Sequence, residues 1–180
     1  MPRKQGWVAL LRAVNLGARN KVPMAELRRV LEEQGCESVR TYIQSGNAVF
    51  TSGVAGRAAL SRRLERAIED AFGIATPVVL RSFRELAGIV ASHPFGADTS
   101  STQVAFLARK PPAAGVRRLR ERDIAPDRVE VAGSDVYLHL PNGVQGSRLS
   151  GAQLERQLGV AATVRNWRTV ARLAEMASES

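Results

Sequence analysis

The sequence is poor in several features that mark particular classes of protein. Its single cysteine, Cys36, excludes an internal disulfide, which fits a reducing cytoplasm. No apolar run approaches the ~20 residues that a membrane-spanning helix needs. The N-terminal segment is basic and then apolar, as in an export signal, but Arg12 interrupts it and no small-residue cleavage site follows. We therefore expect a cytoplasmic protein with no membrane partner, whose first strand begins at Trp7.

Chemically reactive side chains are also few. The two histidines, His93 and His139, do not stand at metal-ligand spacing from each other or from Cys36. The sequence contains no recognisable Cys–His pair, no catalytic triad and no close pair of acids of the kind that hydrolyses glycosides. The sequence therefore predicts no metal and no cofactor, and it identifies no catalytic residue. An enzyme whose residues converge only in the folded chain stays open.

Lysine is scarce, although the chain is strongly basic. The net charge is +9 and only three of the 26 basic residues are lysines. Such a charge is typical of proteins that bind nucleic acid. The abundant arginine and alanine equally fit a GC-rich genome, and most arginines alternate with glutamate along the predicted helices, as on ordinary solvated faces. The charge therefore leaves both a functional basic surface and genome bias open.

Hydrophobic periodicity and turn residues divide the chain into alternating strands and helices. In the first half we predict strands at 7–11, 39–43, 48–51 and 77–81, and helices at 23–34, at 57–72 and after Ser82. In the second half we predict strands at 103–108, 128–132, 135–140 and 162–164, and helices at 112–122, at 149–158 and from Asn166 to about 177. The order of elements is therefore the same in both halves.

Three sequence matches in the same order indicate a tandem duplication. They pair Val8-Ala-Leu-Leu with Val104-Ala-Phe-Leu, Gly53-Val-Ala-Gly with Gly143-Val-Gln-Gly, and the segment 79–84 with 163–168. Each half reads β-α-β-β-α-β with an added helix, which is the ferredoxin-like pattern. We predict an α+β fold made of two ferredoxin-like units with antiparallel sheets, at residues 1–95 and 96–180, within one compact domain.

The loop after the first strand is the best candidate for a functional site. In this topology the first two strands of a unit run the same way, so that loop and the following hairpin turn emerge at one edge of the sheet. A basic loop before a helix start is suited to an anion. The candidate ligand-binding residues are Arg12, Asn15, Asn20, Lys21, Gln44, Ser45 and Asn47. The alternatives are that Arg12 pairs with a structural carboxylate and that the amides bond their own turns.

Polar loops of the second half provide a second set of candidates, which are Ser147, Arg148, Arg165, Asn166, Trp167 and Arg168. The run Gly143–Arg148 slightly resembles a phosphate loop but lacks the Gly-Lys-Ser/Thr ending, so a helix-capping turn is the default interpretation. The Trp167 ring could stack on a base or pack against the protein. These loops leave the sheet at the edge opposite to the hairpin of their own unit.

The chain also resembles a known family. The segments ALLRAVNLGARNKVPMAEL, RTYIQSGNAVF and RNWRTVARLAEM are, in this order, similar to the bacterial family catalogued as domain of unknown function 1697. The resemblance implies a single-domain, cytosolic α+β protein with two ferredoxin-like units, and no activity, substrate or cofactor. The family usually has glycine where this chain has Ala13, Ala18 and Gln145.

Three kinds of function stay open. The first is a non-catalytic module that binds an anion, either a nucleotide, a phosphorylated metabolite or RNA, at the loop after the first strand. The usual aromatic stacking platform for RNA is missing from the predicted strands, so RNA binding would be mainly electrostatic. The second is a small enzyme that acts on a phosphorylated or carboxylated metabolite at the same edge. The third is a protein–protein interaction module that uses an open sheet face, and the oligomeric state is also open.

Overall fold

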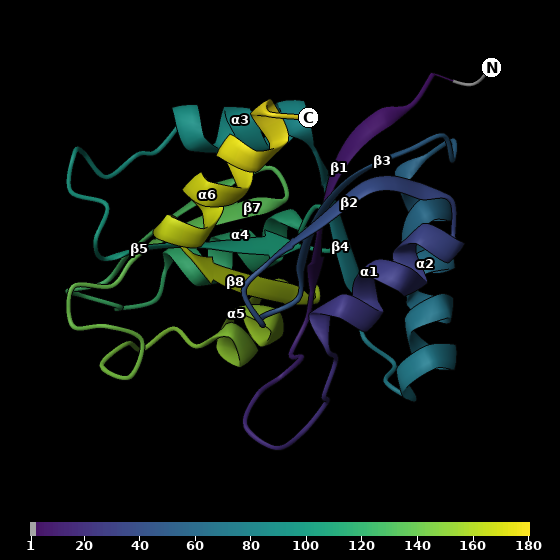
Figure 1. The fold of residues 1–180 in the computed structure, drawn as a ribbon. Coiled ribbons are helices and arrows are strands. Elements are labelled where there is room, and N and C mark those ends of the chain that lie inside the picture. The colour runs from purple at the N-terminus through teal and green to yellow at the C-terminus, as the bar shows by residue number, and fades with distance from the viewer. Residues whose placement is uncertain (1–2) are drawn as a thin grey trace. The chain divides into compact units, whose positions relative to one another are not determined.

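The computed structural model describes residues 3–180, which form eight strands and six helices (Figure 1). By their contacts these residues divide into two compact units. Unit 1 contains the residues up to Gly88 together with Arg172–Ser180, and unit 2 contains Ile89–Ala171. The sequence-based division places the boundary at 95/96 rather than after Gly88, and it assigns the whole C-terminal segment to the second unit. None of the helices formed by residues 3–180 is both long enough and apolar enough to span a membrane.

Unit 1 contains a four-stranded sheet in the order β2-β3-β1-β4, with antiparallel neighbours. Its elements are β1 (Gln5–Leu11), α1 (Met24–Glu33), β2 (Cys36–Tyr42), β3 (Asn47–Ser52), α2 (Arg57–Phe72), β4 (Val78–Ser82) and the first part of α3 (Phe83–Ala91). The bounds of α2 are those that the sequence predicts, because Leu60, Leu64 and Ile68 recur at helical spacing and Gly73 ends the helix in a left-handed conformation.

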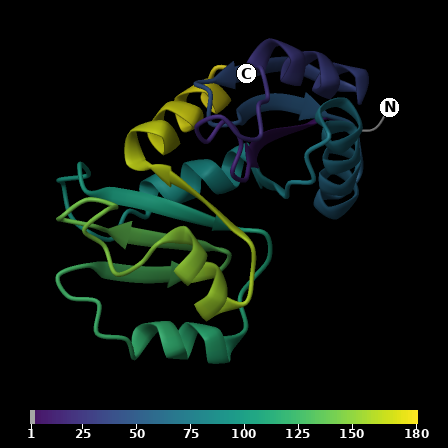
Figure 2. The ribbon, with the colours of Figure 1, turned by 90° about the horizontal axis from the view of Figure 1, so that it is seen from below.

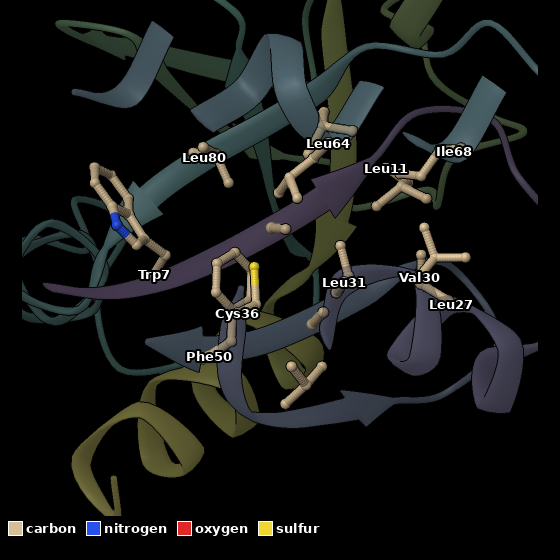
Figure 3. Close-up of a cluster of buried hydrophobic side chains, with 14 of the residues drawn as sticks. Trp7, Leu11, Leu27, Val30, Leu31, Cys36, Phe50, Leu64, Ile68 and Leu80 are labelled. Atoms are coloured by element: carbon tan, nitrogen blue, oxygen red, sulfur yellow. The ribbon is translucent and has the colours of Figure 1, made fainter. Parts of the chain in front are cut away.

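The core of unit 1 lies between one face of this sheet and helices α1 and α2 (Figure 3). Trp7, Phe50 and Leu80 from the strands meet Leu31 of α1 and Leu64 of α2. These side chains are at most 3% exposed. At about 25 cal/mol per Å² of buried apolar area, such a cluster contributes most of the free energy that stabilises a small unit. The core therefore gives the edge loops of unit 1 a rigid support.

Unit 2 repeats this arrangement with the sheet order β6-β7-β5-β8. Its elements are β5 (Thr102–Leu107), α4 (Ala113–Arg120), β6 (Arg128–Ala132), β7 (Asp135–His139), α5 (Gly151–Leu158), β8 (Ala162–Asn166) and the start of α6 (Trp167–Ser178). Helices α4 and α5 lie side by side on one face of the sheet (Figure 2). They approach closely at Gly115, where a Cβ atom would lie 2.9 Å from the Gln157 carbonyl oxygen.

The register of the two sheets supports the duplication. Val8 pairs with Arg81 across β1 and β4, and Val104 pairs with Arg165 across β5 and β8. The residue that follows each arginine then caps a helix. The Ser82 hydroxyl accepts a hydrogen bond from the Glu85 N–H at 3.2 Å, and the Asn166 side chain accepts one from the Thr169 N–H at 2.9 Å. The two halves thus share sequence, strand register and capping chemistry.

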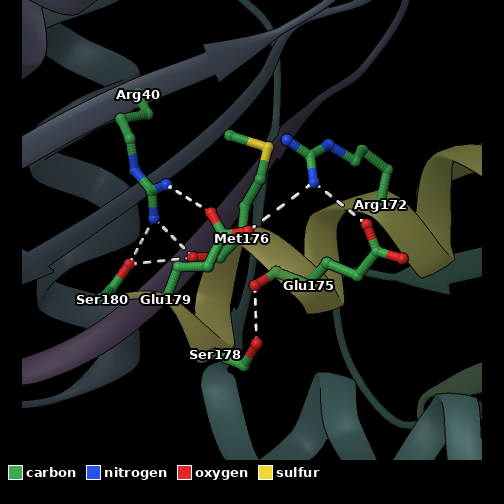
Figure 4. A network of polar contacts seen from close by, with 7 residues as sticks. All are labelled: Arg40, Arg172, Glu175, Met176, Ser178, Glu179 and Ser180. Carbon is green, nitrogen blue, oxygen red and sulfur yellow. Dashed lines mark hydrogen bonds and ion pairs between the residues drawn. The ribbon is translucent and has the colours of Figure 1, made fainter.

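The end of α6 belongs to unit 1 because Arg40 of β2 binds it (Figure 4). The Arg40 guanidinium donates hydrogen bonds to the Met176 carbonyl oxygen and the Ser180 hydroxyl, and it pairs with Glu179 at 3.2 Å. These partners lie more than 130 positions away in the sequence. No local sequence pattern predicts a contact of this range, which explains why the sequence assigns the end of α6 to the second unit.

Both boundaries of strand β2 differ from the predicted ones. Strand β2 begins at Cys36 rather than at 39, because a bulge between Glu37 and Arg40, with Ser38 at a φ of 53°, joins a polar segment to the strand. Ile43, predicted as the last residue of that strand, instead has a φ of 48° and belongs to the turn. The hairpin turn therefore starts one residue earlier than the sequence suggests.

Candidate functional site

The candidate site lies at one edge of the unit 1 sheet, where the loop between β1 and α1 meets the turn between β2 and β3. Both β1 and β2 are antiparallel to β3, so they end at the same edge. The Leu11 N–H donates to the Gly46 carbonyl oxygen at 2.9 Å, and the Asn15 side-chain amide donates to the Gln44 carbonyl oxygen at 2.6 Å. The structure thus brings together the two segments that the sequence places at one edge.

Asn15 is the residue that fastens the two segments to each other. Besides its bond to Gln44, its amide nitrogen donates to the Val22 carbonyl oxygen at 2.8 Å, and its side-chain oxygen accepts the Val22 N–H at 2.8 Å. The Asn20 amide donates to the Ala13 carbonyl oxygen at 3.0 Å, and the Asn15 N–H donates to the Asn20 carbonyl oxygen at 2.9 Å. These amides hold the backbone of the loop, as the turn-bonding alternative anticipates.

The loop keeps a backbone conformation that most residues avoid. Ala13, Asn15 and Asn20 have φ values of 51–54°, and Gly17 has a φ of 61°. Asparagine and glycine tolerate this left-handed region, whereas alanine is strained there. The conformation persists because the surrounding hydrogen bonds fix it, and strain of this kind gathers at functional sites. The observed strain is therefore consistent with a loop shaped for a purpose other than connecting two elements.

The turn between β2 and β3 packs against the root of the loop. Gly46 has a φ of 81°, and a Cβ atom there would lie 2.7 Å from a Val14 methyl carbon and 2.8 Å from the Leu11 Cβ. Asn47 is fully buried, and its amide donates to the Tyr42 carbonyl oxygen at 3.0 Å and to the Ser45 hydroxyl at 2.9 Å. Asn47 therefore braces the turn from inside and does not face the solvent at this edge.

The cations of the loop differ in exposure. Arg12 is half-buried at the root of the loop, where its N–H donates to the Pro77 carbonyl oxygen and its own carbonyl oxygen accepts the Thr76 hydroxyl at 2.5 Å. Arg19 and Lys21 are exposed, and within residues 3–180 neither side chain forms an ion pair or a hydrogen bond. The exposed side chain of Gln44 stands on the facing turn. Arg19 and Lys21 are thus two positive charges without an ionic partner in the described residues, on a loop whose backbone is held by the Asn15 and Asn20 side chains.

Helix α1 begins beside these charges. Pro23, predicted as the first helical residue, has an extended ψ of 131° and is the N-cap, and it offers no side-chain hydrogen bond to the first turn. The Leu27 N–H donates to the Pro23 carbonyl oxygen at 2.9 Å, so the N–H groups of residues 24–26 precede the first helical bond. Such N–H groups and the helix dipole favour a negative charge near Lys21.

Two large apolar side chains are exposed at the same edge. Leu16 is 66% exposed on the loop, and Ile43 is 50% exposed on the facing turn. A φ of 48° is a genuine outlier for a β-branched residue such as Ile43. The sequence gives no sign of this pair, because Ile43 fits the pattern of the preceding strand and Leu16 stands alone in a polar loop. The edge therefore combines cationic and apolar groups.

Ser147 and Arg148, of the second set of candidates, have structural partners in unit 2. The Ser147 hydroxyl and the Arg148 N–H both donate to the Asp127 carboxylate, at 2.8 and 3.2 Å, and the Arg148 guanidinium pairs with Asp123 at 3.5 Å. These bonds make residues 147–148 part of a structured turn before α5, whereas the residue that caps this helix is Ser150, which lies outside the run Gly143–Arg148. This turn requires glycine at position 146, because a Cβ atom at Gly146 would lie 2.6 Å from the Asn142 carbonyl oxygen.

The remaining four residues of that set lie at the junction of β8 and α6. Arg165 is 8% exposed and donates to the Thr163 hydroxyl at 2.6 Å, and burial lowers the pKa of its guanidinium to about 10. Asn166 caps α6, and the Trp167 ring packs edge-on to His93 with centroids 4.6 Å apart. Arg168 is exposed. Trp167 therefore packs within unit 2, which favours its packing interpretation over stacking on a base.

His93, which the sequence shows only as the end of a helix, takes part in a small aromatic cluster in unit 2. Its ring contacts Phe95, Tyr137 and Trp167, and its Nε2 lies 2.8 Å from the Thr102 hydroxyl. The Tyr137 hydroxyl donates to the Ile89 carbonyl oxygen at 2.8 Å. Residues 3–180 contain no group of three or more histidine, cysteine or acidic side chains that could hold a metal ion.

These features define the class of the protein, which is an α+β protein built from two ferredoxin-like units. The chain belongs to the family described as "Protein of unknown function (DUF1697)", whose model matches residues 5–137. No curated protein matches it. A solved structure of a conserved bacterial protein from Streptococcus pneumoniae is similar, with 21% sequence identity and a TM-score of 0.72 over 97% of this chain and 99% of that chain. This likeness confirms the predicted fold.

Proposed function

We propose that this protein is a non-catalytic module that binds a small anion, such as a nucleotide or a phosphorylated metabolite, at the loop edge of unit 1. Arg19, Lys21 and Gln44 would contact the ligand, and Arg12 would stand at the root of the site. The observation that carries the proposal is the Asn15 side chain, whose amide binds the loop and the facing turn at once. It holds two exposed cations on a preformed surface.

A preformed loop favours binding for a simple physical reason. A flexible loop loses conformational freedom when it closes on a ligand, which lowers the affinity, whereas this loop is already ordered by its own hydrogen bonds. Arginine offers planar, bidentate hydrogen bonds to phosphate or carboxylate, and lysine adds a point charge. The first-turn N–H groups of α1 would complete the recognition of an oxyanion.

The amides have a narrower role in this proposal than the sequence suggested. Asn15, Asn20 and Asn47 are expected to shape the site rather than to contact the ligand, because their side chains bond backbone atoms or lie inside the unit. The Ser45 hydroxyl accepts a hydrogen bond from the Asn47 amide and has the same supporting role. The ligand contacts are then confined to Arg12, Arg19, Lys21 and Gln44 together with backbone N–H groups.

A thermal-shift experiment tests the proposal with defined probes. Pyrophosphate, ATP and a short single-stranded RNA are added to the wild type, to Arg19→Gln/Lys21→Gln and to Arg62→Gln/Arg66→Gln. The last variant is the matched control, because it removes two exposed positive charges from α2, elsewhere in unit 1. A ligand at ten times its Kd stabilises the folded state by about 1.4 kcal/mol, which raises the melting temperature by about 3–5 °C.

The outcomes separate three functions. The proposal predicts that pyrophosphate or ATP stabilises the wild type and the control, and that the loop variant loses most of this response. A response of equal size in all three proteins would contradict the proposed site. Stabilisation by RNA alone, which disappears between 50 and 300 mM salt, would instead favour an electrostatic RNA-binding protein. Conversion of ATP to another product during incubation would favour the alternative of a small enzyme at this edge.

A further inference from the structure

Unit 2 contains a basic hollow, which lies between helix α4 and the hairpin of β6 and β7. Its volume is about 660 Å³. Three cations, Lys110, Arg117 and Arg120, line it together with apolar groups of Pro111, Val116 and Val131. Volumes of roughly 300–1,000 Å³ are typical of sites for small organic ligands. The hollow is therefore large enough for a molecule of nucleotide size and carries charge of one predominant sign.

The cations of the hollow are not used by the protein itself. In the described part of the chain, the side chains of Lys110, Arg117 and Arg120 form no hydrogen bond and no ion pair. Nearby arginines do have structural partners, since Arg118 donates to the Gln157 carbonyl oxygen and Arg109 to that of Gly159, both at 3.0 Å. Helix α4 thus carries two kinds of arginine, one that binds α5 and one that faces the hollow.

The apolar part of the lining distinguishes the hollow from an ordinary solvated arginine face. Pro111 is buried, and Val116 and Val131 are half-buried and pack on the core of unit 2. They form an apolar floor beneath cationic walls, and Glu121 is the one acid among the lining residues. An inorganic anion would use only the walls, and a neutral apolar compound only the floor. A ligand that combines both features would use the whole surface.

We infer that this hollow binds a small organic anion that carries an apolar ring or short chain, such as an aryl or acyl phosphate. Arg117 and Arg120 contact the anionic group, Lys110 adds to the positive potential, and Val116 and Val131 contact the apolar part. The start of α4 adds to the attraction, because its N-cap Pro112 supplies no side-chain hydrogen bond to the first turn. The inference concerns unit 2 and stands independently of the function proposed for unit 1.

The experiment compares one compound with its two fragments. Isothermal titration measures the affinity of the full chain for 1-naphthyl phosphate, for inorganic phosphate and for 1-naphthol. We expect the ester to bind at least about tenfold more tightly than either fragment, because only the ester gains both the charge-assisted hydrogen bonds and the apolar contact. An ester that binds no better than one of its fragments, or that does not bind at millimolar concentration, would overturn the inference.

Two neighbouring alanines locate the binding. Ala113 lines the hollow and Ala114 does not, although both are exposed in the first turn of α4. Ala113→Glu should weaken binding of the ester about tenfold by placing a negative charge in the hollow, whereas Ala114→Glu should change it by less than about twofold. Equal effects of the two variants would overturn the assignment.

Charge removal gives a second comparison on the same helix. Arg117→Gln should weaken binding of the ester about tenfold, whereas Arg118→Gln, which removes the same charge from outside the hollow, should leave it nearly unchanged. The unit 1 variant Arg19→Gln/Lys21→Gln should bind the ester as the wild type does. Loss of binding in that variant would move the ester to the loop of unit 1 and overturn this inference, even if the function proposed for unit 1 holds.

Discussion

Replacing Asn15 with alanine should destabilise unit 1 far more than a loop substitution ordinarily does. The change removes three hydrogen bonds of 2.6–2.8 Å, two donated by the side chain and one accepted from the Val22 N–H. Each such bond contributes about 0.5–1.5 kcal/mol, and a buried N–H left without a partner costs about 1–3 kcal/mol. Val22 is 1% exposed. We therefore expect Asn15→Ala to lower the free energy of unfolding by about 3 kcal/mol.

A matched variant, Asn20→Ala, separates the contribution of the Asn15 hydrogen bonds from that of the backbone strain. Asn20 has nearly the same φ, of 51°, and is exposed, but its side chain donates a single hydrogen bond, to the Ala13 carbonyl oxygen. Asn20→Ala should thus cost about 1 kcal/mol. Both substitutions place alanine in a left-handed conformation, so the backbone strain is similar and largely cancels in the comparison. The difference of about 2 kcal/mol then reports the additional bonds of Asn15, one to the Gln44 carbonyl oxygen in the turn and two to Val22 within the loop.

Urea unfolding followed by tryptophan fluorescence measures this difference. The chain contains two tryptophans, of which Trp7 lies in the core of unit 1 and Trp167 in unit 2. A Trp167→Phe background leaves Trp7 as the reporter of unit 1. If Asn15→Ala and Asn20→Ala differed by less than about 0.5 kcal/mol in this background, the Asn15 side chain would not hold the loop and the turn in a fixed conformation, and the site would not be preformed.

Three further predictions concern the backbone, pH and thiol chemistry. Ala13→Gly should raise the melting temperature by relieving the strain at a φ of 54°. Ala18 has no positive φ, so Ala18→Gly should instead lower the free energy of unfolding by about 0.5–1 kcal/mol, and the melting temperature with it. Burial would raise the pKa of Glu85, but hydrogen bonds from Arg57 and the Ser82 backbone outweigh this effect and lower the pKa. The ionised Glu85 side chain therefore stabilises the fold fully above pH 4.5, and this stabilisation is lost as the pH falls through the lowered pKa. Glu85→Gln should therefore flatten the acid limb of a plot of melting temperature against pH, and an unchanged limb would contradict this. Burial raises the pKa of the Cys36 thiol to about 11. Ellman's reagent should therefore react with the native protein about a hundredfold more slowly than with the urea-unfolded chain. Equal rates would show that the Cys36 thiol is not buried.

The sequence predicts the elements of this fold well, because most of them bury one face and end at a turn or cap residue. Helix α2 and the first strand of the unit 2 hairpin have the predicted bounds, since leucine spacing in one case and a Gly133-Ser134 turn in the other are local signals. The start of β2 is not predictable in this way, because the bulge near Ser38 is fixed by pairing with β3. The contact of Arg40 with the end of α6 is likewise a tertiary feature.

The candidate site is predictable only in its location. Strand direction follows from the order of elements, and it is enough to place the loop at 12–21 beside the turn at 44–47. The roles of the amides are not encoded locally, because an asparagine in a turn can equally face a ligand or bond the backbone. The structure shows that Asn15 and Asn47 bond the backbone. The hollow beside α4 escapes sequence analysis because helix packing alone decides which arginines face it.

The most direct test of the central claim is a titration of the wild-type protein with pyrophosphate, followed residue by residue through its backbone amide signals in nuclear magnetic resonance spectra. A loop and turn that form one anion site predict saturable shifts, with a common Kd, in the signals of residues 15–26 and 43–47. The signals of α2 should stay in place. Shifts spread evenly over the arginine-bearing helices, or confined to residues outside these two segments, would contradict the account.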